Sequence, residues 1–109
     1  MTEKIFNKLV RDKIPDIIRK NGEEPLYKVL DKDRYLAELD KKLAEECAEY
    51  EESRKTEELA DIIEVIYAIC AARGISPEEL DSIRTAKKDK RGGFENRIFL
   101  SGKLIRADK

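Results

Sequence analysis

Two long segments with apolar residues at helical spacing, separated by only a few residues, constrain the fold of this chain more than any other feature. At about 100° per residue, the apolar side chains of each segment fall on one side of a helix. The first segment runs from about Asp31 to Ser53, and the second from about Glu57 to Arg73. Helices joined by so short a connection run antiparallel and pack face to face. The sequence therefore predicts a helical hairpin. Its apolar stripes comprise Tyr35, Leu36, Leu39, Leu43, Cys47 and Tyr50, and then Leu59, Ile62, Ile63, Val65, Ile66, Ile69 and Cys70.

Shorter segments complete a mainly α fold. A short helix is predicted from about Arg11 to Lys20, because Asn21-Gly22 supplies a stop signal. Another is predicted from Pro77, a residue suited to the first helical position, to about Lys90. The segment Leu26–Leu30 is consistent with a short strand, and Phe94–Arg106 with a small β-hairpin. We therefore expect residues 1–109 to form a single domain, an antiparallel helical bundle with a small β-hairpin near its C-terminal end.

Five acidic residues lie where closing the hairpin brings them together: Glu45, Glu46, Glu49, Glu58 and Asp61. Glu46 falls inside the apolar stripe of its helix, and Glu58 projects between apolar positions of the next one. Carboxylates on a partly buried wall repel one another and lose hydration, so some stay protonated or a cation neutralises them. Oxygen ligands of this kind suit Mg²⁺ or Mn²⁺. The alternative is a set of solvated acids, since Asp and Glu supply 24 of the 109 residues.

The chain has no histidine, and this absence removes several classes of enzyme. Ser-His-Asp and Cys-His catalysis, HExxH zinc sites and imidazole bases are all excluded. If the protein is an enzyme, water activated by a metal ion is the best remaining mechanism, with a free carboxylate accepting the proton.

Four segments carry a resemblance to a known family. The acidic segments read KLAEECAEYEES (residues 42–53) and EELADIIEVIYAI (residues 57–69). They resemble the ExxE/ExxD core of the all-α NTP pyrophosphohydrolase superfamily, which includes MazG, dimeric dUTPases and phosphoribosyl-ATP pyrophosphohydrolase. The flanking segments KLVRDKIPDII (residues 8–18) and KRGGFENRIFL (residues 90–100) resemble a MazG-like branch, often labelled phosphoribosyl-ATP pyrophosphohydrolase-like. Only eight residues separate Glu49 from Glu58, which is shorter than the usual MazG spacing.

The resemblance implies a Mg²⁺-dependent hydrolase that cuts a nucleoside triphosphate between its α and β phosphates and releases pyrophosphate. It implies catalytic roles for Glu45, Glu46 and Glu49, and metal binding by Glu46, Glu49, Glu58 and Asp61. Two alternatives stay open. One is phosphoribosyl-ATP pyrophosphohydrolase of histidine biosynthesis. The other is a non-catalytic helical module for oligomerisation or nucleotide sensing.

Basic residues are candidates for binding the phosphates of such a substrate. Lys and Arg can clamp phosphate oxygens, and glycines allow a close approach of the backbone. Residues Lys87 to Arg91 form a basic run that ends in Gly92-Gly93. The candidate substrate-binding residues are Lys8, Arg11, Lys13, Lys90 and Arg91. The alternative for the basic run is a solvated helix end, where cations are favoured by the helix dipole.

Composition and hydropathy define the expected setting of the protein. The net charge of −1 gives no overall attraction to nucleic acid, and no apolar run is long enough for a membrane span. We therefore expect a soluble cytoplasmic protein with reduced, buried Cys47 and Cys70. The second hairpin helix is apolar around most of its circumference, which predicts a homodimer or higher homo-oligomer.

Overall fold

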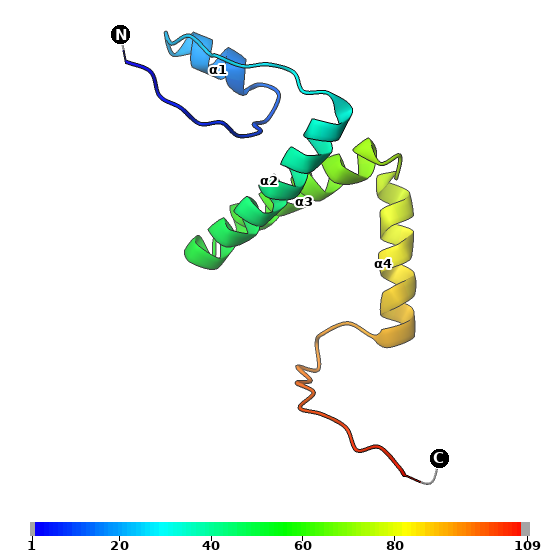
Figure 1. Cartoon of the computed structure of the whole chain (residues 1–109). Helices are drawn as coiled ribbons and strands as arrows, with labels where there is room; N and C mark the ends of the chain where they lie inside the picture. Colours follow the sequence, from blue (N-terminus) through cyan, green and yellow to red (C-terminus); the bar gives the residue numbers. More distant parts are fainter. Residues whose placement is uncertain (1, 108–109) are drawn as a thin grey trace. The chain divides into compact units, whose positions relative to one another are not determined.

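The computed structural model of the chain describes residues 2–107, and this part is mainly helical (Figure 1). The helices are α1 (Ile14–Lys20), α2 (Lys32–Ser53), α3 (Thr56–Ala72) and α4 (Pro77–Arg91). The predicted helices are thus confirmed, with ends within a few residues of those expected. The chain divides into two compact units, one ending at Pro77 and the other beginning at Glu78. The single domain inferred from the sequence stays a prediction.

The long helix α2 begins and ends at well-defined capping residues. The side chain of Asp31 accepts a hydrogen bond of 2.9 Å from the backbone amide of Arg34, which satisfies one of the free donors of the first turn. At the other end, Arg54 adopts a left-handed conformation with φ of 60°. Its backbone amide donates a hydrogen bond of 2.8 Å to the carbonyl of Tyr50. A left-handed residue at this position ends the helix and reverses the chain.

Helices α2 and α3 form the predicted hairpin. Only Arg54 and Lys55 connect them, and the two helices lie against each other (Figure 1). The buried apolar side chains among the described residues are Leu39 on α2 and Val65 and Cys70 on α3. The hairpin therefore supplies the core of the first unit.

The buried strip on the hairpin is narrower than the apolar stripes in the sequence. Cys47 is exposed, so its predicted burial is wrong, while Cys70 is buried and both cysteines are free thiols. Leu59 and Ile63 on α3 are 43% and 50% exposed. A helix that packs on one partner buries only the centre of its apolar face, and residues at the edge stay in contact with solvent.

The two β predictions are wrong for the described residues. No strand occurs within residues 2–107, neither at Leu26–Leu30 nor at Phe94–Arg106. A strand needs a partner for its backbone hydrogen bonds, and neither segment has one. Their apolar side chains are correspondingly exposed, with Val29 at 91% and Phe99 at 91%. Within the described chain, none of the helices has both the length and the apolarity needed to cross a membrane.

Candidate metal centre

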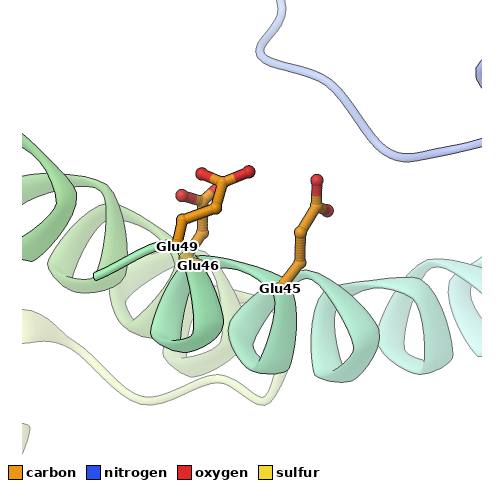
Figure 2. A group of neighbouring side chains, drawn as sticks. All are labelled: Glu45, Glu46 and Glu49. Carbon is orange, nitrogen blue, oxygen red and sulfur yellow. The ribbon is translucent and has the colours of Figure 1, made fainter. Parts of the chain in front are cut away.

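The helical hairpin brings the five predicted acidic residues into two overlapping groups. Carboxylate oxygens of Glu45, Glu46 and Glu49 on α2 lie within 4.8 Å of one another. Oxygens of Glu46, Glu58 and Asp61 also lie within 4.8 Å of one another, and the last two residues come from α3. Figure 2 shows the three glutamates of α2 projecting from the same side of the helix. Glu46 belongs to both groups and is therefore the residue that joins them.

Glu46 is the buried charged residue of this site. It is 6% exposed, although a glutamate is almost never fully buried without a partner. Its Oε1 atom lies 3.4 Å from the Nζ atom of Lys42. Its Oε2 atom is buried and has no hydrogen-bond partner among the described residues. A buried carboxylate oxygen without a donor is costly, and an ion or a water is the usual way in which such an atom is satisfied.

The surroundings of Glu46 raise the pKa of its carboxyl group above the ordinary value. Burial is the largest cause, because it disfavours the charged form. The charge of Glu49 acts in the same direction, and a proton shared with Glu49 would also favour the neutral form. Lys42 opposes both effects through its hydrogen bond and its charge. Without a metal ion, the site therefore holds a proton more firmly than a solvated glutamate does.

Two cations of the N-terminal segment reach the acidic groups. The Nζ atom of Lys8 lies 3.5 Å from Oε1 of Glu45 on α2. The guanidinium of Arg11 donates a hydrogen bond of 2.8 Å to Oδ1 of Asp61 on α3. Both pairs are partly exposed, so each contributes at most about 1 kcal/mol to stability. Their importance lies in position, because they place two positive charges beside the acids of both helices.

The other predicted basic residues lie outside the hairpin helices α2 and α3. Lys13 precedes α1, is exposed, and makes no ion pair within residues 2–107. Lys90 and Arg91 end α4 and belong to the second unit.

Lys42 is a member of the site that the sequence analysis missed. Its Nζ atom lies 3.3 Å from Oε2 of Glu45, in addition to its contact with Glu46. Its side chain is only 17% exposed. The signal was present in the sequence, because Lys42 precedes these glutamates by three and four residues, and such residues are neighbours on a helix. The cluster therefore carries an internal positive charge that any metal ion would have to displace or tolerate.

The connection between α2 and α3 is bridged by a contact to Glu58. The hydroxyl of Ser53, the last residue of α2, lies 3.5 Å from Oε1 of Glu58 in the first turn of α3. This contact spans the short connection between the helices. It links the position of one acidic residue directly to the geometry of the turn.

Comparisons with known proteins give no functional assignment. No protein-family model matches the chain, and no solved structure matches it. A curated protein of Mycolicibacterium smegmatis, described as an uncharacterized protein, is 54% identical over 41 residues. This similarity covers 38% of the present chain and 42% of the relative, which is less than half of the length of either.

Proposed function

We propose that the acidic groups of the hairpin bind Mg²⁺ and that the protein is a nucleoside triphosphate pyrophosphohydrolase. The observation that carries this proposal is Glu46, a buried carboxylate with one oxygen lacking a donor, placed where two acidic groups overlap. An all-oxygen donor set fits Mg²⁺, with Mn²⁺ as a substitute. The resemblance of the acidic segments to the all-α NTP pyrophosphohydrolases supplies the reaction, cleavage between the α and β phosphates.

The proposed roles of the acidic residues combine the family resemblance with their positions in the hairpin. Glu46, Glu49, Glu58 and Asp61 are the proposed metal ligands. When bound, Mg²⁺ lowers the pKa of a coordinated water and neutralises phosphate charge. Glu45 already has basic partners in Lys8 and Lys42, so it is suited to orienting water at the edge of the cluster. A carboxylate of α2 that is not occupied by metal accepts the proton of the attacking water.

Lys8 and Arg11 are the best supported of the proposed phosphate-binding residues. Arg11 lies 2.8 Å from Asp61, a proposed metal ligand, and Lys8 lies 3.5 Å from Glu45 at the edge of the cluster. A triphosphate bound through Mg²⁺ would bring its own oxygens to this place, and Lys and Arg bind such oxygens strongly. Lys13, Lys90 and Arg91 remain proposals on the basis of the sequence alone.

The direct test is release of pyrophosphate from canonical and modified nucleoside triphosphates and from phosphoribosyl-ATP. We expect release with Mg²⁺ or Mn²⁺ and none with excess chelator. If phosphoribosyl-ATP were by far the best substrate, the protein would be the histidine-biosynthetic enzyme instead. If a folded sample that binds metal were inactive on the whole panel, the non-catalytic nucleotide-sensing module would be the correct reading.

Replacement of Lys42 by methionine is expected to strengthen metal binding. Methionine retains an apolar stem of similar length but removes the positive charge beside Glu45 and Glu46. The loss of one competing charge should lower the Kd for Mn²⁺ by about tenfold, or about 1.4 kcal/mol. Calorimetric titration of Mn²⁺ into the chelator-treated protein measures this change.

Lys41→Met is the matched control for this measurement. Lys41 has a 75% exposed side chain and pairs with Glu38, outside the acidic groups. It should leave the Kd unchanged. Weaker Mn²⁺ binding by Lys42→Met would instead show that Lys42 supports the metal-loaded site.

We also propose that the chain forms a homodimer or higher oligomer in the cytoplasm, with the hairpin as part of a helical bundle. Leu59, Ile63 and Tyr67 follow one another at intervals of four residues on α3, and each is 43–50% exposed. Residues at this spacing form a continuous stripe on a helix. Helices of a second subunit would cover this stripe and complete the bundle.

A further inference from the structure

The basic residues of α4 are arranged on one face of the helix. Arg84, Lys87, Lys88 and Arg91 have the spacing i, i+3, i+4 and i+7, which places them side by side. All four line one open cavity of about 850 Å³, together with Gly92, Gly93, Phe94 and Glu95. Lys90, although adjacent in sequence, does not line it. The cavity lies wholly within the second unit and has the size of a small-molecule site.

This face carries more positive charge than its neighbourhood balances. Arg84 is paired with Asp81 at 2.9 Å. Within residues 2–107, Lys87, Lys88 and Arg91 have no ion pair. Like charges three and four residues apart on a helix destabilise it. The helix dipole favours cations in the last turn, but it does not require them to share one face. An anion bound in the cavity would relieve this repulsion.

The chain turns back toward the cationic face directly after α4. Gly92 has a φ of 87°, a left-handed conformation that a glycine adopts without strain, and its amide donates a hydrogen bond of 2.7 Å to the carbonyl of Lys88. Phe94 follows and lines the same cavity, with 96% of its surface exposed. An exposed aromatic ring beside several cations provides a flat surface for a planar ring and partners for an attached anion.

We propose that this face of α4 is a nucleotide-binding site that takes a nucleoside polyphosphate. The phosphates bind Lys87, Lys88 and Arg91, and the base lies against the ring of Phe94. The choice of a nucleotide rests on the proposed function, but the binding itself needs neither a metal ion nor turnover. The site thereby adds Lys87, Lys88 and Phe94 to the proposed nucleotide-binding residues.

The test is calorimetric titration of ATP, adenosine and inorganic triphosphate into the full-length protein in excess chelator. We expect ATP to bind without metal, and K87Q/K88Q to weaken its binding by about 10- to 100-fold. The control is K103Q, which removes a positive charge from an exposed position of the same unit outside the cavity and should change the Kd by less than about twofold. F94A should weaken the binding of ATP while leaving the binding of inorganic triphosphate unchanged. Circular dichroism of each variant checks that helix content is retained, as expected for substitutions at exposed positions.

Three results would overturn the proposal. They are an absence of ATP binding in chelator, an equal loss of ATP binding in K87Q/K88Q and K103Q, and much tighter binding of a single-stranded oligonucleotide than of ATP. The experiments also distinguish failure of this binding site from failure of the proposed enzymatic function. Metal-free binding without Mg²⁺-dependent hydrolysis would retain this site and refute the enzyme. Hydrolysis that depends on Glu46 but is unaffected in K87Q/K88Q would support the enzyme and refute this binding site.

Discussion

Glu46→Gln is expected to abolish Mg²⁺-dependent pyrophosphate release, with kcat lowered by at least about 10³-fold. Glu46 is shared by both acidic groups, so its replacement takes a carboxylate, the proposed metal ligand, from each of them at once. Glutamine has nearly the same shape, so the fold should persist. Asp61→Asn should also lose activity, because Asp61 is the acid of the second group that faces Arg11. Continuous measurement of pyrophosphate over a range of Mg²⁺ concentrations gives the result.

The matched control for this loss is Glu52→Gln. Glu52 also lies on α2, near its C-terminal end, but it is exposed and belongs to neither acidic group. Its replacement removes the same charge from the same helix and should leave kcat within about twofold of the original value. Near-normal rates in both Glu46→Gln and Asp61→Asn would show that the acidic cluster is not the reaction centre.

The second large effect is expected on stability without metal, where Glu46→Gln should raise the Tm at pH 7. The pKa of Glu46 is raised in the folded protein, so the folded state holds the proton more tightly than the unfolded state. Ionisation therefore costs stability as the pH rises above the ordinary value of 4.5, and the whole cost is present above the raised pKa. Relief of about 1 kcal/mol would raise the Tm by roughly 4–8 °C.

Thermal unfolding in chelator between pH 4 and pH 8 measures this difference. The gain in Glu46→Gln should shrink toward zero as the pH falls below 4.5, since Glu46 is then protonated in both states. Glu49→Gln should move the transition to lower pH, because the Glu49 charge is the second cause of the shift. A gain that is constant with pH would assign the effect to packing, and Glu52→Gln should show no gain.

The helices were predictable because their signals are local. Asp31 caps α2, Pro77 begins α4, and the apolar spacing of α2 and α3 spans several turns. The meeting of Glu46 with Glu58 and Asp61 was predictable from the short connection together with the helical positions of these acids relative to the apolar stripes. These features depend on residues that are close in sequence.

The features that were missed depend on partners rather than on spacing. The strands predicted at Leu26–Leu30 and Phe94–Arg106 needed a second strand, which the sequence pattern does not specify. Cys47 lies at the edge of its stripe, and its exposure depends on how many helices cover it. The pairing of Lys42 with the acids was readable from its position, but lysines on a helix are usually solvated.

The short link between α2 and α3 makes the acidic cluster sensitive to chain length rather than to the identity of the linking side chains. Eight residues separate Glu49 from Glu58, and Arg54 and Lys55 are the part of this interval outside the helices. One residue added within a helix would rotate every later side chain by about 100°, carrying Glu58 and Asp61 away from Glu46. Substitutions in the link that are compatible with the left-handed conformation of Arg54 should therefore be tolerated, whereas insertions and deletions separate the two halves of the cluster. The length of this interval therefore determines which carboxylates of α2 and α3 lie close to one another.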